Sequence, residues 1–260
     1  MTQIDFDIGY GRQFASWYDR LFPDQAEAKR TARALAGLHP DPDTGTLEIG
    51  IGTGRIALPL ARIIGPVHGL DSSPEMVSAA QAASAADGGP ITTEQANILA
   101  YPVKRSYGLV YAVCATLNQI LFPEQQAEAI RRAADLLTPG GRLVIEAHHR
   151  SMVVSIHGGA RFTTFFTPYP EPGSGLLTCS TLSADHTLWQ CSQIWHEADS
   201  SAPIGTEFSR LLEPAEVHAY AETAGLVSAC PAAGFSDWSF AATASAAAPA
   251  FITIHEKPTD

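Results

Sequence analysis

The stretch LEIGIGTGRIALPLA, residues 47–61, joins one carboxylate to three glycines in a spacing that suits the binding of a ligand. Glu48 precedes the glycines, which occupy alternate positions at Gly50, Gly52 and Gly54. The residues before them have the pattern of a short buried strand, and those after them the pattern of a helix. Such a unit directs backbone N–H groups and the positive end of the helix dipole at a ligand. The glycines allow that ligand to approach the backbone closely.

Two classes of cofactor bind to a glycine turn of this kind, and the nearby side chains distinguish between them. A dinucleotide places its pyrophosphate at the helix N-terminus and favours the pattern G-x-G-x-x-G. Arg55 occupies the third small position of that pattern, and Glu48 would place a negative charge beside the pyrophosphate. A cofactor with an ammonium group is instead attracted by Glu48. A nucleotide-dependent oxidoreductase stays open as an alternative, and it predicts affinity for NAD(H).

The glycine stretch resembles the first motif, E-x-G-x-G-x-G, of class I S-adenosylmethionine-dependent methyltransferases. It is similar, more narrowly, to bacterial small-molecule enzymes that methylate sugar amines and other specialised metabolites. The resemblance covers about 1–150 and, more weakly, 206–260. It implies that the loop wraps the methionine half of S-adenosylmethionine, with Glu48 linked to the amino group directly or through water. It also implies methyl transfer to a nitrogen or oxygen of a small molecule in natural product biosynthesis, with S-adenosylhomocysteine as product and no metal.

The end of the second expected strand carries another acidic residue, Asp71, seventeen positions after Gly54. A carboxylate there can accept hydrogen bonds from both ribose hydroxyls. An Asp after a strand is by itself more often a helix cap, but its distance from the glycine loop favours binding. The resemblance implies that Ser72 and Met76 flank the ribose and the adenine.

Two further stretches depart from the family pattern. The family often has an acid at the position of Asn97, so the amide oxygen would have to meet the adenine amino group, while Ile98 packs on the adenine face. Asn97 is equally well explained as a turn residue. Cys114 is expected to line the cofactor, and Ala115 stands where the family commonly has Asn. These departures leave a non-catalytic cofactor-binding protein open as a second alternative.

The segment FASWYDRLFP, residues 14–23, resembles the part of these enzymes that covers the cofactor. The resemblance implies that Tyr18 reaches the methionine carboxylate and that Arg20 pairs with it. The alternative is an amphipathic helix that places Phe14, Trp17 and Tyr18 in a core.

A base on the acceptor side is needed only if the acceptor arrives protonated. His148 and His149 follow the fifth expected strand, at the carboxyl edge where open α/β sheets bind ligands. Histidine is the commonest base at neutral pH, so one of the two is the candidate. A structural role for each of them is the competing interpretation.

Candidate acceptor-binding residues lie in the stretch TLWQCSQIWHE and shortly after it. Strand alternation places Trp189 and Trp195 on one face, where they line an apolar pocket or pack the strands onto the rest of the chain. Arg210 is expected to meet an acidic group of the acceptor, or else to pair with Glu207 or Glu213.

Strands that alternate with helices predict an α/β fold. We expect a Rossmann-like, seven-stranded, mostly parallel sheet with helices on both faces, built from 1–150, including N-terminal covering helices, and from 211–260. Residues 151–210 are rich in β-favouring stretches and predict an antiparallel β insertion that forms an acceptor-side lid. The expected strands of the main sheet span 46–49, 66–71, 91–95, 107–113, 142–148, 226–230 and 251–256.

The composition narrows the partners. The chain has 27 acidic and 16 basic residues and a formal net charge of −11, which disfavours nucleic acid. It has no apolar run long enough for a membrane span and no secretory signal. The four cysteines form no C-x-x-C pair, so neither a zinc site nor a disulfide is indicated. We expect a cytoplasmic monomer or homodimer whose partner is a small-molecule acceptor.

Overall fold

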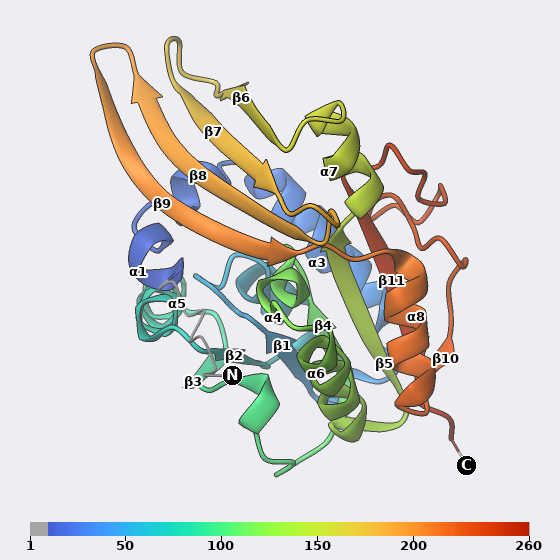
Figure 1. Cartoon of the computed structure of the whole chain (residues 1–260). Helices are drawn as coiled ribbons and strands as arrows, with labels where there is room; N and C mark the ends of the chain where they lie inside the picture. Colours follow the sequence, from blue (N-terminus) through green and yellow to red (C-terminus); the bar gives the residue numbers. More distant parts are fainter. Residues whose placement is uncertain (1–9, 260) are drawn as a thin grey trace.

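The computed structural model describes residues 10–259 and contains two sheets (Figure 1). The larger sheet has seven strands in the order β10-β11-β5-β4-β1-β2-β3. Strands β1 to β5 pair in parallel, whereas β11 is antiparallel to β5 and β10 is antiparallel to β11. The predicted mostly parallel, seven-stranded sheet is therefore confirmed. Its strands are β1 (Thr46–Ile49), β2 (Val67–Asp71), β3 (Ile91–Gln95), β4 (Tyr107–Ala112), β5 (Leu137–His148), β10 (Val227–Ser228) and β11 (Ala250–Glu256).

Helices cover both faces of this sheet, and each side has its own hydrophobic core. On one face α3 (Gln25–Leu38) and α4 (Ala57–Ile64) bury alanine and leucine side chains against β2, β4 and β11. On the other face α6 (Pro123–Asp135) and α8 (Pro214–Thr223) pack against β5 and β11. The fifth helix, α5 (Pro74–Asp87), packs against β2 and β3. This arrangement fixes the carboxyl ends of the parallel strands at one edge of the molecule.

The second sheet is antiparallel and is built entirely from the insertion between β5 and α8. Its strands are β6 (Phe162–Pro168), β7 (Gly175–Leu182), β8 (Leu188–Glu197) and β9 (Ser200–Arg210), hydrogen-bonded in that order. Figure 1 shows it crossing the end of the larger sheet, above β1 and β4. The insertion does not begin with a strand, because α7 (Arg150–His157) precedes it.

One face of the second sheet, here called the inner face, is turned toward the larger sheet. It carries Trp189, Cys191, Gln193 and Trp195 of β8, as the alternation predicts. The Trp189 ring meets the His148 ring edge-on, with 5.3 Å between the centroids. The inner face therefore lies directly over the carboxyl end of β5.

Two short helices precede α3, and the first of them lies between β9 and α5 (Figure 1). They are α1 (Tyr10–Phe14) and α2 (Tyr18–Leu21). Phe14 and Tyr18 form a small core with Met76 of α5 and Trp195 of β8. The N-terminal segment thus connects the two sheets. Three 3-10 turns complete the framework of the site: η1 (Pro42–Thr44), η2 (Ile98–Ala100) and η3 (Thr116–Gln119).

Candidate cofactor and acceptor site

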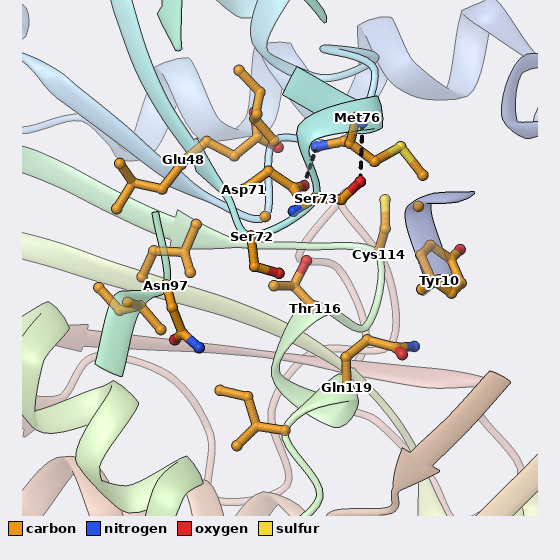
Figure 2. A pocket seen from close by; sticks show the side chains of 18 of the residues that line it. Tyr10, Glu48, Asp71, Ser72, Ser73, Met76, Asn97, Cys114, Thr116 and Gln119 are labelled. Carbon is orange, nitrogen blue, oxygen red and sulfur yellow. Dashed lines mark hydrogen bonds between the residues drawn. The ribbon is translucent and has the colours of Figure 1, made fainter. Parts of the chain in front are cut away.

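A cavity of about 510 Å³ lies at the carboxyl ends of β1, β2 and β4. Figure 2 shows the side chains that surround it. All residues predicted to bind the cofactor line this cavity except Arg20 and Gly54. The lining members are Tyr18, Glu48, Gly50, Gly52, Asp71, Ser72, Met76, Asn97, Ile98 and Cys114. Their individual roles in binding stay predictions, but the fold brings them together around one space.

The glycines of the loop have different tasks. Gly50 and Gly52 both have left-handed backbones, with φ of 75° and 55°. A Cβ at Gly50 would lie 2.4 Å from the Thr116 side chain, so packing within the protein excludes one. The atom nearest to a Cβ at Gly52 would be Tyr18 Cζ at 4.0 Å, so the space that faces the Gly52 Cα is open. Gly54 lies outside the lining, and its Cβ would contact Ile91. Gly52 is therefore the position at which a ligand can approach the backbone.

Asp71 fastens this loop to the end of β2. Its Oδ2 accepts a hydrogen bond from Gly52 N at 2.9 Å, and its Oδ1 accepts one from Ser73 N at 2.9 Å. Burial raises the pKa of Asp71, and the backbone donors oppose that shift. An ionised carboxylate offers about four acceptor positions, so the backbone donors leave room for a ribose hydroxyl.

Glu48 is almost fully buried at the end of β1, with 2% of its surface exposed. Tyr111 Oη donates a hydrogen bond to Glu48 Oε2 at 2.9 Å. Burial raises the pKa of Glu48 to about 8, and this hydrogen bond only partly opposes the shift. A carboxyl group in this state gains most from a positive charge, such as the ammonium group of an amino acid.

Arg55 is a site residue that the sequence interpretation used only as an argument against a dinucleotide. Arg55 lines the cavity, and its guanidinium packs 4.8 Å from the centre of the Phe22 ring and donates from Nη2 to Cys114 Sγ at 2.8 Å. Within residues 10–259, its buried Nε and Nη1 donate no hydrogen bond of good geometry, although Glu27 Oε2 lies 3.9 Å from Nη1 and the Tyr18 phenol interacts with the side chain. Buried donors without acceptors are rare in proteins. The sequence signal for this site residue was the arginine directly after the third glycine, Gly54.

Arg20 lies elsewhere. It forms an ion pair with Glu197 at the tip of β8, and its guanidinium stacks 4.9 Å from the Trp17 ring and 4.8 Å from the Trp195 ring. It does not line the cavity. Its expected role toward the methionine carboxylate stays a prediction, but the cation at the glycine loop is Arg55.

The two arginines give a matched test of which cation holds the methionine carboxylate. We expect Arg55→Met to weaken S-adenosylhomocysteine binding about tenfold or more, because a charged hydrogen bond contributes about 1.5–3 kcal/mol. Arg20→Met should change the affinity by less than about threefold, because exposed ion pairs contribute little. Calorimetry on both variants measures the difference. A larger loss in Arg20→Met would return the role to Arg20.

Part of the cavity lining is apolar. Met76 and Ile98 are buried and line it together with Ser72 and Asn97. Asn97 Oδ1 accepts a hydrogen bond from Leu99 N at 3.0 Å, so the turn interpretation of this residue describes a real contact. The amide still lines the cavity, and its carbonyl oxygen has a second acceptor position for an adenine amino group.

Cys114 and Ala115 form a strained turn after β4. Both have left-handed backbones, with φ of 53° and 59°. The Cys114 N–H donates to Glu146 Oε2 at 2.8 Å, which holds the turn in place. Burial raises the pKa of the Cys114 thiol to about 12, so the group that faces the cavity is a neutral thiol.

The two candidate histidines differ in their surroundings. His148 faces Trp189 under the inner face, and burial lowers its pKa to about 4. His149 is buried, packs edge-on against Phe251, and has its Nε2 3.2 Å from Glu213 Oε2. Neither histidine lines the cavity. The role of either as a base stays a prediction.

The predicted acceptor residues also lie outside the cavity lining. Trp195 belongs to the core formed with Phe14 and Tyr18, and Trp189 covers His148. Arg210 pairs with Glu216 at 2.9 Å and not with either glutamate suggested by the sequence. Their binding roles stay predictions.

Residues 10–259 lack two features that would indicate other classes of function. No helix in that range is long and apolar enough to cross a membrane. No group of three or more histidine, cysteine, aspartate or glutamate side chains in the same range is arranged to hold a metal ion.

Comparisons with known proteins agree on one activity. Residues 46–141 match a family model described as a methyltransferase domain. A protein of Geobacillus sp. (strain WCH70), provisionally named a methyltransferase, is 29% identical over 178 residues, or 67% of this chain and 70% of that protein.

Solved structures match over nearly the whole chain. The CcbJ methyltransferase from Streptomyces caelestis has a TM-score of 0.83 and 24% identity, and the match covers 96% of this chain and 98% of that one. CalS10 from Micromonospora echinaspora, solved with S-adenosylmethionine, is described as an amino pentose methyltransferase involved in calicheamicin biosynthesis. It has a TM-score of 0.67 and 15% identity, and the match covers 92% of this chain and 96% of that one. The similarity in fold therefore includes both sheets.

Proposed function

We propose that this chain methylates a nitrogen or oxygen of a small molecule. Its methyltransferase domain and its fold are those of an S-adenosylmethionine-dependent methyltransferase. We further propose that the acceptor is a specialised metabolite, which would place the enzyme in natural product biosynthesis. The description of CalS10 as an amino pentose methyltransferase supports this class of acceptor.

The observation that carries the proposal is the pair of opposite charges at the glycine loop. Glu48 and Arg55 both line the cavity beside the open space at Gly52. A carboxylate and a guanidinium together complement the ammonium and carboxylate groups of an amino acid. A pyrophosphate would gain from Arg55, but it would oppose the ionisation of Glu48 and would be repelled by the ionised form.

The chemistry requires little of the protein beyond binding and alignment. When bound, S-adenosylmethionine supplies a methyl group on a positively charged sulfur that needs no further activation. The loop and Asp71 hold the donor, while α1 and the second sheet close the cavity from the other side. Excluding water and aligning the reacting atoms contribute several kcal/mol to catalysis. Trp189 and Trp195 on the inner face favour an acceptor with an aromatic or apolar part.

Calorimetry with S-adenosylmethionine, S-adenosylhomocysteine and NADH tests the cofactor. We expect the first two to bind at pH 8 and NADH to show no heat of binding, because the carboxylate form of Glu48, which the ammonium group stabilises, repels a pyrophosphate. Uptake of NADH alone would favour the nucleotide-dependent oxidoreductase.

Turnover tests the activity itself. We expect release of S-adenosylhomocysteine with at least one member of a panel of aminopentoses, cyclic secondary amines and phenols. Binding of the cofactor without turnover of any member would favour the non-catalytic alternative. The cytoplasmic location and the monomeric or homodimeric state stay predictions.

A further inference from the structure

The inner face of the second sheet carries a carboxylate, Glu207, to which the sequence and the proposed function give no catalytic role. Glu207 lies opposite Cys191 in the pairing of β9 with β8, so both side chains are on the same face. Cys191 is 1% exposed, whereas Glu207 retains part of its surface. The carboxylate is thus partly buried between the two sheets.

The partners of Glu207 are neutral amides. Gln193 Nε2 donates a hydrogen bond to Glu207 Oε1 at 2.9 Å, and the Gln119 side chain also hydrogen-bonds to the carboxylate. None of the ion pairs within residues 10–259 includes Glu207. In the same range, Gln193 Oε1 is buried and receives no hydrogen bond. Glu207 and Gln193 Oε1 are therefore hydrogen-bond acceptors for which the surrounding protein supplies too few donors.

This cluster adjoins the cavity on the side of the N-terminal helices. Gln119 and Tyr10 both line the cavity, and Figure 2 shows them near Cys114. Burial is the main cause of the raised pKa of the Tyr10 phenol, and the negative charge of the nearby Glu207 is the second. A molecule that enters between Tyr10 and Gln119 would therefore approach Glu207 from the cavity.

We propose that Glu207 is a catalytic residue that binds the N–H or O–H group of the acceptor and takes its proton, a role that rests on the proposed methyltransferase function. The lone pair of the acceptor atom forms the bond to the methyl carbon, while the carbon–sulfur bond breaks and its electron pair stays on sulfur. The acceptor's proton moves to a Glu207 oxygen and from there to solvent. Gln193 Oε1 accepts a hydrogen bond from a second polar hydrogen of the methyl acceptor and so orients that molecule.

The titratable side chains next to Glu207 on α1 and β8 do not change charge near neutral pH, whereas Glu207 does. Burial raises the pKa of Glu207 to about 7. Tyr10 on α1 and Cys191 on β8 have raised pKa values and stay neutral there. His148, beneath Trp189 on the same side, has its pKa lowered to about 4. Since Glu207 must be ionised to take a proton, activity should rise with pH through about 7, whereas dependence on His148 would place the rise near 4.

The decisive variant is Glu207→Gln, with Glu171→Gln as its matched control. Glu171 is exposed in the turn between β6 and β7, so this change removes the same charge from the same insertion. The acceptor is the panel member that the wild type turns over fastest. We expect kcat/KM to fall about 100-fold in Glu207→Gln and to stay within about threefold in Glu171→Gln. With S-adenosylmethionine at saturation, so that the ionisation of Glu48 does not limit cofactor binding, the inflection near pH 7 should disappear only in Glu207→Gln.

Two further measurements separate catalysis from folding. Glu207→Gln should bind S-adenosylhomocysteine as the wild type does, because Glu207 does not line the cofactor cavity. Its Tm at pH 8 should equal or exceed that of the wild type, because a buried ionised carboxylate is replaced by a neutral amide.

Each remaining outcome has a definite meaning. If Glu207→Gln keeps activity within about threefold of the wild type, the proposal is overturned. A loss in His148→Gln with an inflection near pH 4 would give the role to His148 instead. If the wild type turns over no acceptor, the proposed function fails and this role with it, whereas an active wild type with an equally active Glu207→Gln removes only the role of Glu207.

Discussion

Replacing Gly52 with valine is expected to abolish the binding of S-adenosylmethionine and S-adenosylhomocysteine while the protein remains folded. The space before Gly52 is open in the protein, so an added side chain would occupy the place where the ligand approaches the loop. The left-handed backbone at Gly52, with φ of 55°, adds strain that lowers stability. Calorimetry should therefore show no heat of binding, while circular dichroism keeps the helical signal.

Gly65 provides a matched control for this substitution. It follows α4, has a left-handed backbone with φ of 88°, and no atom would lie within 4 Å of an added Cβ. Gly65→Val therefore also places a valine at a positive φ, as Gly52→Val does, but its side chain lies away from the cavity. We expect both variants to lose about 1–2 kcal/mol of stability, and only Gly52→Val to lose the ligand. Normal affinity in Gly52→Val would contradict the proposed cofactor site.

The second large effect concerns the charge of Glu48 and the pH. With a pKa of about 8 in the free protein, Glu48 is mostly protonated at pH 7. An ammonium group beside it favours the ionised form, so binding should release close to one proton. The affinity for S-adenosylhomocysteine should then increase as the pH rises from 6 to 8. Calorimetry in buffers of different ionisation enthalpy measures the released proton directly.

Glu48→Gln is expected to remove this proton release and to weaken binding about 30-fold at pH 8, which corresponds to about 2 kcal/mol. The difference from the wild type should shrink at pH 6, where Glu48 is neutral in the free protein. Tyr111→Phe tests the cause of the pKa, because it removes the hydrogen bond to Glu48 and should move the inflection to higher pH. An affinity independent of pH in the wild type would contradict the role of Glu48.

The stability of the free protein should respond in the opposite sense. The folded-state pKa of Glu48 lies above its ordinary value of 4.5, so the unfolded state ionises first as the pH rises. The free energy of unfolding therefore decreases between pH 4.5 and about 8. Glu48→Gln should raise Tm at pH 8 even as it weakens binding.

The fold was largely predictable because its elements follow local patterns. The strand at 91–95 has the predicted bounds, and Asp24 caps α3 through hydrogen bonds from Ala26 N and Glu27 N. The start of the insertion was predicted less well. Residues 151–210 were expected to form an antiparallel β insertion, yet the stretch RSMVVSIH at its start forms α7, where Val153 is buried against Leu182 and Leu211. Tertiary packing outweighs a weak local preference there. The sixth expected strand, 226–230, is shorter than predicted, since only Val227–Ser228 pairs with β11.

The sequence by itself determined the cofactor side of this protein. Glu48, the glycines and Asp71 lie at the ends of neighbouring strands, so the order of strands and turns along the chain already implies that they meet. The tertiary structure alone decided which arginine faces the cavity and that Glu207 meets Gln119. Those contacts join segments distant in sequence, and they depend on how the second sheet and the N-terminal helices pack across the first. Local periodicity specifies which side chains share a face, whereas the partner of that face is set by packing between elements.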